Sequence, residues 1–441
     1  MGARIGIRRE DMYQWERRVP LIPDHLRELT DGAGLSFAVQ SSDKRAFSDD
    51  EYRAAGMDVI ESLTDCPIVI GLKEIPVSVL EEGKAYVFFS HTIKGQSGNM
   101  PMLRRCLDLG CTVIDYERIV DDENRRLVFF GNYAGLAGMI DTLWTLGRRL
   151  AWEGIANPLE GIRQASTYAN LNEAKTAVRE AGKRIASEGL PAEISPLVIG
   201  IAGYGNVSKG AQEILDLLTT VEISPADLLR DSAPPSGPDR AAVKVVFREE
   251  DTVLPLVGGK PFDLEEYRAY PERYRAAFER YLPRLHALVN CIYWEAKYPR
   301  LVTAEAIRSL YEEGQSALRV IGDISCDVEG SIEVTVKACE PDDPVYVYEP
   351  QTGTIRSGIE GVGPVMMTVE ILPSELPREA SSYFGAILKG FVPAIAVADY
   401  RADFDALALP PELKRAVICH RSKLAPDYRY LERHLSRAES E

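Results

Sequence analysis

Two ionisable side chains follow neighbouring apolar runs of the chain, each at the point where its run ends. Lys73 follows IVIGL and His91 follows AYVFFS. Continuously apolar runs are typical of parallel strands covered on both faces, and open α/β sheets bind ligands at the carboxyl ends of such strands. A lysine backed by an apolar strand can have a pKa near neutrality, and histidine titrates there already. The pair is therefore a candidate for acid–base catalysis, and the sequence leaves open which residue is the acid and which the base.

Four further charged residues could bind a substrate. Arg17 and Arg18 stand in WERRVPLIP, where a guanidinium can clamp a substrate carboxylate through two hydrogen bonds. Glu74 and Glu117 follow their strands and can hold a cationic amine. Taken singly, such residues more often form surface ion pairs. We nevertheless take these four as the candidate substrate-binding residues.

A glycine-rich turn lies in the middle of the chain, in IAGYGNVSKGAQEIL. Gly203 ends an apolar strand, Gly205 comes two residues later, and an amphipathic helix follows. In such a turn the backbone N–H groups at the helix N-terminus face a pyrophosphate, and the glycines admit its close approach. Ser208 occupies the place of the third glycine of the usual GxGxxG pattern. The turn predicts a dinucleotide site, with a purely structural turn as the alternative.

The choice of dinucleotide depends on the strand that follows this turn. In the usual fold, an acidic residue at the end of the second strand binds the ribose 2′-hydroxyl of NAD. We expect the second strand over 220–224, and its end at Ile223 offers no clear acid, since Glu222 is expected to point away. This favours a 2′-phosphate, so the predicted cofactor is NADPH, with NADH as the alternative.

Two aspartates follow the last apolar strand of this region, in GDISCDVEG. We interpret Asp327 as a site residue and Asp323 as a support for the end of the strand. No His or Cys set at ligand spacing accompanies them, so no metal is predicted.

The elements that must position these residues alternate between strand-like and helix-like segments, which predicts an α/β fold of two doubly wound parallel sheets. The expected strands of the first sheet are 4–8, 36–40, 67–72, 85–90 and 112–115, and its helices are 20–30, 48–55, 76–82 and 99–109. A long helix beginning at GNYAGL follows. The expected strands after it include 197–203, 243–247, 286–293 and 318–324.

The position of the glycine turn in mid-chain predicts a discontinuous architecture. We expect a Rossmann dinucleotide-binding domain over 132–330, inserted into a substrate and catalytic domain made of 1–131 and 331–441. A helix is expected at 379–388 in the returning segment.

Composition excludes several classes of function. Asp and Glu number 67 against 51 Lys and Arg, a net charge of −16, which disfavours nucleic acid and anionic membranes as partners. The 7 cysteines form no CxxC pair and suit a reducing compartment. No apolar run approaches the length of a membrane span or a secretory signal. We therefore expect a cytoplasmic enzyme acting on small molecules.

Nine motifs together resemble a known family. In chain order they are WERRVPLIP, GLKEIP, FFSHTIKGQ, IDYERIV, FFGNYAGLAGMID, GYGNVSKGAQ, VNCIYWE, GDISCDVEGSIE and ELPREASSYFG. The chain is similar from about Arg4 to Pro393 to lysine–ketoglutarate reductase, the lysine-forming saccharopine dehydrogenase. In animals and plants this enzyme is the N-terminal half of a bifunctional aminoadipate-semialdehyde synthase. The wider superfamily is that of alanine dehydrogenase and transhydrogenase.

The resemblance implies the reaction and the role of each residue. The reaction is the reversible, NADPH-dependent reductive condensation of L-lysine with 2-oxoglutarate to saccharopine. Lys73 and His91 match the catalytic lysine and histidine, and Asp327 matches an aspartate near the nicotinamide. The resemblance implies that Arg18 binds substrate, and that Glu74 and Glu117 bind substrate and also set the protonation of the catalytic lysine. The residues that fall on the cofactor site are Gly203, Gly205, Asn206, Val207 and Cys291.

Two alternative functions remain at this point. One is an opine-type or alanine dehydrogenase that acts on another amine and keto acid. Another is a dinucleotide-binding protein without turnover, which the presence of both Lys73 and His91 disfavours. The oligomeric state is open, a homodimer being one option. The length leaves no room for a saccharopine-cleaving domain, so we expect only one half of the bifunctional pathway.

Overall fold

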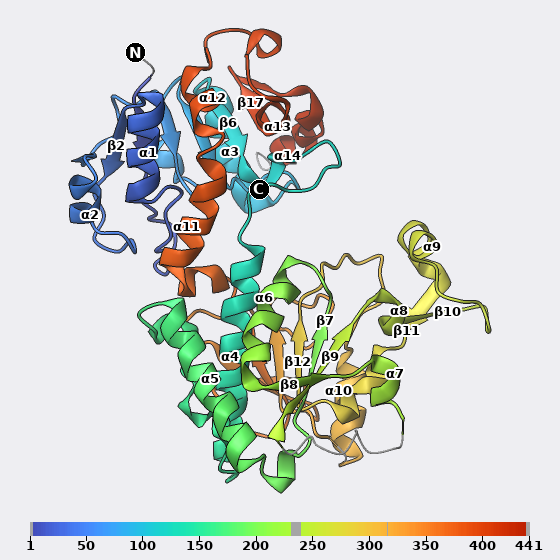
Figure 1. Ribbon diagram of the computed structural model, residues 1–441. Coiled ribbons are helices and arrows are strands. Elements are labelled where there is room, and N and C mark those ends of the chain that lie inside the picture. The colour runs from blue at the N-terminus through green and yellow to red at the C-terminus, as the bar shows by residue number, and fades with distance from the viewer. Residues whose placement is uncertain (1–2, 231–239, 315, 438–441) are drawn as a thin grey trace. The chain divides into compact units, whose positions relative to one another are not determined.

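The computed structural model describes residues 3–230, 240–314 and 316–437, and the chain divides into two compact units. Unit 1 consists of Met1–Phe130 and Pro377–Glu441, and unit 2 of Gly131–Leu376 (Figure 1). Unit 1 is thus discontinuous, and the chain leaves it close to the expected residue 131. The expected return at residue 331 is wrong, because the chain comes back only at Pro377.

The sheet of unit 1 is mostly parallel. Its strand order is β18-β17-β6-β5-β4-β1-β2-β3 within the described residues. The strands are β1 (Ile5–Ile7), β2 (Phe37–Gln40), β3 (Asp58–Ile60), β4 (Ile68–Ile70), β5 (Ala85–Phe88), β6 (Thr112–Asp115), β17 (Val417–His420) and β18 (Lys423–Leu424). Neighbouring strands from β3 to β6 pair in parallel, whereas β17 from the returning segment pairs antiparallel with β6.

The helices of unit 1 come from both parts of the chain. They are α1 (Pro23–Ala33), α2 (Asp49–Ala54), α3 (Met100–Asp108), α11 (Pro377–Leu388), α12 (Val392–Val397), α13 (Pro411–Arg415) and α14 (Glu432–Arg437). The helix expected over 76–82 is wrong, because only the single 3₁₀ turn Val77–Val79 forms there. Two β-branched valines close to Pro76 disfavour a longer helix. Strand β3 was not predicted from the sequence, because three residues carry too little pattern.

The sheet of unit 2 has the order β15-β14-β16-β13-β12-β7-β9-β8. Its strands are β7 (Val198–Ala202), β8 (Thr220–Glu222), β9 (Ala242–Phe247), β12 (Ala287–Asn290), β13 (Val320–Asp323), β14 (Val345–Glu349), β15 (Thr354–Ser357) and β16 (Val365–Met367). The six strands from β8 to β16 pair in parallel. Because β16 pairs with β13 and β14 pairs with β16, the segment after residue 330 stays in unit 2.

Helices cover both faces of this second sheet (Figure 1). One apolar layer lies under α4 (Gly131–Trp152), α5 (Leu171–Glu188) and α6 (Asn206–Leu215). The opposite layer contains the apolar side chains of α7 (Pro225–Leu228) and α10 (Ala304–Glu312). A small hairpin of β10 (Val253–Pro255) and β11 (Tyr274–Ala276) follows α8 (Glu249–Thr252) and carries α9 (Leu264–Ala269). The predicted class, two doubly wound and mainly parallel α/β sheets, is confirmed.

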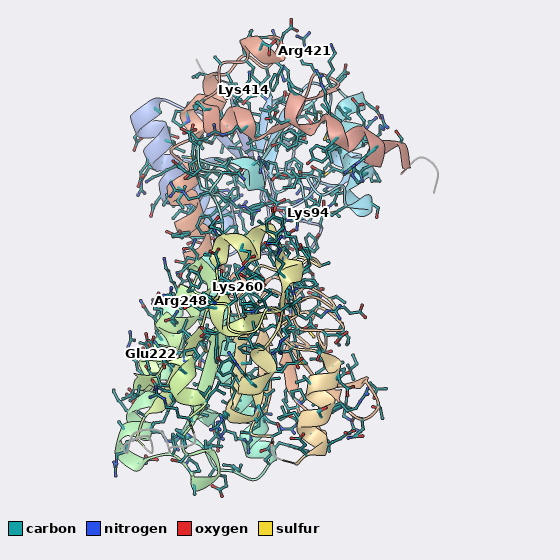
Figure 2. All side chains as sticks on the ribbon, turned by 90° about the vertical axis from the view of Figure 1, so that its right-hand side faces the viewer. Lys94, Glu222, Arg248, Lys260, Lys414 and Arg421 are labelled. Atoms are coloured by element: carbon teal, nitrogen blue, oxygen red, sulfur yellow. The ribbon has the colours of Figure 1, made fainter. Side chains whose placement is uncertain are left out.

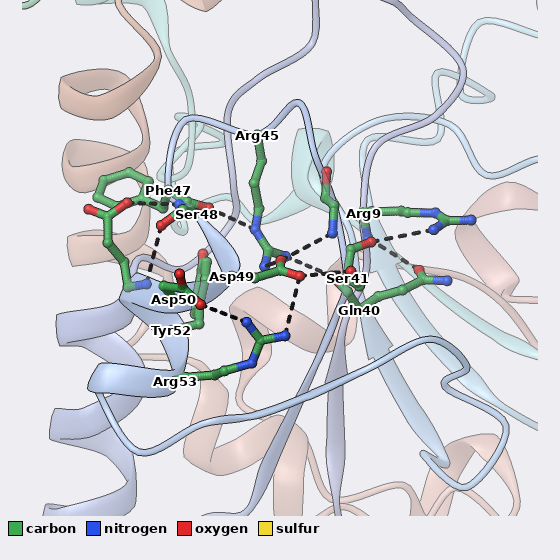
Figure 3. A network of polar contacts seen from close by, with 12 residues as sticks. Arg9, Gln40, Ser41, Arg45, Phe47, Ser48, Asp49, Asp50, Tyr52 and Arg53 are labelled. Atoms are coloured by element: carbon green, nitrogen blue, oxygen red, sulfur yellow. Dashed lines mark hydrogen bonds and ion pairs between the residues drawn. The ribbon is translucent and has the colours of Figure 1, made fainter.

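The segment between β2 and α2 is fixed by a network of polar contacts around the buried Arg45 (Figure 3). The Arg45 guanidinium donates to the carbonyls of Phe47 (2.8 Å) and Gln40 (2.7 Å) and pairs with Asp49. It also lies 4.5 Å from the centre of the Tyr52 ring. Every one of these partners lies within the segment or at its ends, so the network stabilises the loop rather than presenting groups to a ligand.

Within the described residues, no helix has both the length and the apolarity needed to cross a bilayer.

Candidate active site

Lys73 and His91 lie on the same edge of the sheet of unit 1. Strands β4 and β5 pair in parallel with Ile70 opposite Val87, and each candidate stands three residues beyond the last residue of its strand. Both side chains are half-buried. The structure therefore brings the two residues to neighbouring loops, as the sequence predicted.

His91 is held by its backbone and by its ring. Its φ of 46° lies in the left-handed region, which non-glycine residues rarely adopt and which is often found at functional sites. The ring Nδ1 lies 2.5 Å from Glu74 Oε1, and the ring stacks on Phe89 with centroids 6.0 Å apart. The carbonyl of His91 accepts a hydrogen bond from Asn99. Two contacts of the ring and one of the backbone thus fix the direction of the imidazole.

Glu74 is the buried carboxylate of this site, with 7% of its surface exposed. Burial would raise its pKa, but the hydrogen bond and charge of His91 lower the pKa below its usual value. Its second oxygen, Oε2, is buried and has no hydrogen-bond partner among the described residues. A buried anionic oxygen without a donor is costly, and a bound cation or N–H donor would satisfy it.

The two predicted arginines behave differently. Arg18 is buried, and its Nε and Nη2 donate to the two carboxylate oxygens of Glu16 at 2.8 and 2.6 Å. Its guanidinium also lies 4.3 Å from the centre of the Phe130 ring. Arg17 is exposed and donates to the carbonyl of Lys44. Arg18 is thus held in the interior against Phe130, whereas Arg17 lies at the surface.

Four aromatic rings, which we name the aromatic layer, underlie these groups. They are Phe89, Tyr116, Phe130 and Phe384. Phe130 and Phe384 stack with centroids 4.4 Å apart, and both lie within 6.2 Å of Phe89. His91 stacks on one end of the layer and Arg18 covers the other. Phe384 comes from α11 in the returning segment, and the sequence analysis did not single it out.

Glu117 lies after β6 on the same edge and pairs with Arg126 at 2.8 Å. Its backbone N–H donates to the buried Asp115, which also accepts from the Ser90 hydroxyl. Burial and the charge of Glu117 raise the pKa of Asp115 to about 6. Asp115 was missed from the sequence, because a carboxylate at the last position of a strand looks like an ordinary strand end.

In unit 2 the glycine turn connects β7 to α6. Gly203 has φ +101°, and a Cβ there would lie 3.1 Å from the carbonyl of Cys291, so only glycine fits without strain. A Cβ at Gly205 would meet open space. No side chain in the described part of the chain caps α6, which begins at Asn206 and Val207. Its first backbone N–H groups therefore fit a pyrophosphate.

The neighbouring strand ends lie at this same edge, because Asn290 is in register with both Ala202 and Asp323. Cys291 follows β12, is buried, and donates its N–H to the carbonyl of Ala202 at 2.9 Å. Asp327 follows β13 on an exposed loop. Cys291 and Asp327 are thus both near the glycine turn in the sheet order.

Asp323 is buried at the end of β13 and accepts hydrogen bonds from Asn290 and Thr335. It supports the strand end, in the position expected.

The strand expected over 220–224 forms as β8, but its expected place beside β7 is wrong. Strand β9, and not β8, lies beside β7, because β8 pairs only with β9 at the edge of the sheet. Ile223 therefore lies two strands away from β7, where its N–H donates to the carbonyl of Lys244. The end of β9 carries Arg248, whose guanidinium lies 5.0 Å from the centre of the Tyr204 ring within the glycine turn.

Arg248 is exposed on the surface of unit 2, where Figure 2 labels it. Its neighbour Glu249 accepts a hydrogen bond of 3.2 Å from the Tyr204 hydroxyl. The sequence analysis missed Arg248 because 39 residues separate the end of β7 from the start of β9.

Several known proteins are similar to this chain. Residues 6–137 match the family "Alanine dehydrogenase/PNT, N-terminal domain". The alpha-aminoadipic semialdehyde synthase of Arabidopsis thaliana is 37% identical over 97% of this chain and 41% of its own length. The mitochondrial protein of the same name from Rattus norvegicus is 35% identical over 97% of this chain and 47% of its own. The chain is thus similar to the alpha-aminoadipic semialdehyde synthases. It spans about half the length of these relatives.

A second group of relatives has nearly the same length as this chain. The saccharopine dehydrogenase [NAD(+), L-lysine-forming] of Emericella nidulans is 26% identical over 88% of this chain and 91% of its own. The family resemblance inferred from the nine motifs is thus confirmed.

Two solved structures share the fold. An L-alanine dehydrogenase matches with a TM-score of 0.62 at 18% identity, covering 98% of this chain and 99% of its own. A transhydrogenase from Sinorhizobium meliloti matches with a TM-score of 0.58 at 15% identity, covering 96% of this chain and 100% of its own. These likenesses concern the fold alone.

Proposed function

We propose that this protein is an NAD(P)-dependent oxidoreductase acting on CH–NH bonds, and that it condenses L-lysine with 2-oxoglutarate to form saccharopine reversibly, with NADPH. The observation that carries the proposal is a set of groups in unit 1. A buried carboxylate oxygen of Glu74, to which no described residue donates, lies beside an imidazole, and an amine stands on the neighbouring strand end. The names of the relatives support the same reaction.

The substrate lysine must bind as a cation and react as a neutral amine. The free Glu74 Oε2 is a suitable acceptor for an ammonium group, because it is buried and anionic. Attack on the keto carbon requires that the ε-amine lose a proton, and loss of water requires that the departing oxygen gain one. His91 and Lys73 lie on neighbouring loops and can share these two transfers.

The keto acid needs a cationic partner. Arg18 engages Glu16 through Nε and Nη2, and among the described residues no acceptor is recorded for Nη1. That nitrogen is the donor that remains for a carboxylate of 2-oxoglutarate. Burial of Arg18 against Phe130 makes such a contact stronger than it would be in water.

In unit 2, the residues of the glycine turn fit a dinucleotide. The N–H groups at the start of α6 would bind the pyrophosphate, close to Gly203, Gly205, Asn206 and Val207. Arg248 lies at the end of the strand beside β7, where a cation favours a 2′-phosphate, so the preferred cofactor is NADPH. Cys291 and Asp327 would border the nicotinamide. When bound, NADPH supplies the hydride that reduces the imine.

The reaction is tested with purified protein, NADPH, 2-oxoglutarate and a panel of amines that includes L-lysine, ornithine, alanine and ammonia. We expect oxidation of NADPH with lysine, and a product with the mass of saccharopine. Turnover with ammonia or alanine alone would point instead to an alanine or opine-type dehydrogenase. Cofactor binding without turnover on any amine would contradict catalysis altogether.

A further inference from the structure

Glu10 lies beside the loop that carries Lys73. It follows β1, the strand that pairs in parallel with β4. The backbone ladder between these strands ends where Arg8 N donates to the carbonyl of Ile70. Beyond that bond the Glu10 side chain continues the connection: Oε1 accepts from the N–H of Leu72 at 2.7 Å, and Oε2 accepts from the N–H of Lys73 at 3.0 Å.

The same loop is held from its other side. The Tyr116 hydroxyl donates to the carbonyl of Gly71 at 2.8 Å. Gly71 also lies close to Glu10, since a Cβ on that glycine would be 3.6 Å from Glu10 Oε1. The main chain from Gly71 to Lys73 is thus fixed by side chains from two other segments of unit 1.

We propose that Glu10 is a positioning residue, whose carboxylate fixes the backbone of Leu72 and Lys73 and so sets the direction in which the Lys73 amine leaves the sheet. This inference rests on the proposed function, in which Lys73 transfers protons.

The surroundings of Glu10 explain why the residue type matters. Only 7% of its surface is exposed, and burial, with the charge of Glu16, raises its pKa to about 7 although the Arg8 guanidinium and the two N–H donors oppose the shift. A buried carboxylate is an expensive way to connect two strands. Both oxygens are nevertheless engaged, and a glutamine would turn one of these acceptors into a donor facing an N–H group.

The first test compares Glu10→Gln and Glu10→Asp with wild type. We expect Glu10→Gln to lower kcat about 30- to 100-fold, as displacement of a catalytic group by about 1 Å can do. The KM values and the dissociation constant of NADPH, measured by fluorescence titration, should change less than about threefold. Glu10→Asp keeps two acceptor oxygens on a shorter side chain and should recover part of kcat. It also keeps the test open if the glutamine variant does not fold.

A matched control is Glu51→Gln. Glu51 is also a carboxylate of unit 1 that accepts a backbone hydrogen bond, from Ser48 N–H at 2.7 Å, but it belongs to the start of α2. We expect this variant to lose some thermal stability and to keep the kcat of wild type. A kcat for Glu10→Gln within threefold of wild type, or a loss matched by Glu51→Gln, would overturn the proposal.

The pH profile separates positioning from a merely structural role. The charged and titratable groups around Glu10 are Arg8, Glu16, Lys73 and Tyr116. If the ionised carboxylate fixes the loop, the fall of kcat/KM of wild type below about pH 7 should include the protonation of Glu10. Glu10→Gln should show a shallower acid limb. An unchanged acid limb would contradict a role for the ionised form.

A readout without turnover distinguishes failure of this proposal from failure of the proposed function. Acylation of lysines by a small activated ester, followed by peptide mass spectrometry, reports the reactivity of each amine. We expect the rate at Lys73 to change at least threefold in Glu10→Gln, with the other lysines unchanged. If no amine gives turnover but this change occurs, the reaction is wrong and the positioning stands. If turnover occurs and Lys73 reacts as in wild type, the positioning is wrong.

Discussion

The carboxyl edges of the two sheets present different kinds of chemical group. In unit 1 the edge carries ionisable side chains in pairs, the buried Glu74 with the half-buried His91 and the buried Glu16 with the buried Arg18. In unit 2 the corresponding edge consists of a glycine turn and the uncapped N-terminus of α6. Parallel sheets of the same class thus offer side-chain chemistry at one edge and backbone donors at the other.

The physical difference lies in what each edge must tolerate. Buried ion pairs lose hydration and are stable only when each partner is well placed, so the edge of unit 1 depends on second-layer contacts such as the aromatic layer. The edge of unit 2 depends instead on space, because a backbone that binds a pyrophosphate must admit close approach. Substitutions in unit 1 should therefore act on kcat, and those in unit 2 on affinity for the dinucleotide.

The largest expected effect is that of Lys73→Met. Removal of the amine takes away one proton-transfer group, and kcat should fall about 10²- to 10⁴-fold with the NADPH dissociation constant unchanged. Steady-state kinetics and fluorescence titration measure the two quantities. Lys183→Met, which removes an exposed lysine of α5 paired with Glu180, is the control and should have the activity of wild type. Turnover of Lys73→Met near the wild-type value would show that the Lys73 amine of unit 1 is not needed for proton transfer.

A second effect concerns stability against pH at the edge of unit 1. The pKa of Glu10 is raised from 4.5 to about 7 on folding, so between these values the folded state holds a proton that the unfolded state has released. This contribution is fully present below about pH 4.5 and is lost as the pH rises toward 7. The shift from 4.5 to about 7 corresponds to about 3 kcal/mol of stability, because each pKa unit is worth about 1.36 kcal/mol.

Urea unfolding of wild type and Glu10→Gln between pH 5 and 8 measures this contribution. The dependence of the free energy of unfolding on pH should be flatter in the variant over that range, although Asp115, whose pKa is also raised, keeps part of the slope. Parallel curves for the two proteins would show that Glu10 ionises normally.

In unit 2, Gly203→Ala tests the need for a backbone conformation that favours glycine, and Gly205→Ala tests the need for open space at the turn. At Gly203 the φ of +101° and the nearby Cys291 carbonyl should make an alanine cost about 1–3 kcal/mol of stability. At Gly205, where an added Cβ meets open space in the protein, stability should be unchanged. Thermal unfolding measures both. If Gly205→Ala nevertheless weakens NADPH binding, the added Cβ occupies space that the bound dinucleotide needs. Equal melting temperatures for the two variants would contradict the steric argument.

The smallest expected effect is on the choice of cofactor. Arg248→Ala removes the cation at the end of β9 and should weaken NADPH binding about tenfold, the value of one hydrogen bond to a charged group, while NADH binding stays the same. Titration with both dinucleotides measures the ratio. Arg356→Ala, an exposed arginine of the edge strand β15, serves as control. If Arg248→Ala weakens the binding of NADPH and of NADH equally, Arg248 does not bind the 2′-phosphate.

Local features of the molecule could be predicted from the sequence. Apolar runs such as AYVFFS and the glycines of the turn identify the parallel strands and their ends, because strand burial and backbone conformation depend on the residues themselves. Lys73 and His91 are found in the same way, since both stand directly after such runs. The discontinuous layout follows from the position of the turn in mid-chain.

What only the tertiary structure decided is which distant segments meet. Pairing of β9 with β7 places Arg248, and not Ile223, after the strand beside β7, next to Tyr204 of the glycine turn. Pairing of β16 with β13 kept the segment up to Leu376 in unit 2. Arg18 is distinguished from Arg17 by its contacts with Glu16 and Phe130. These outcomes depend on the free energy of packing between parts of the chain that are far apart in sequence. A short motif does not specify which of those parts will pack together.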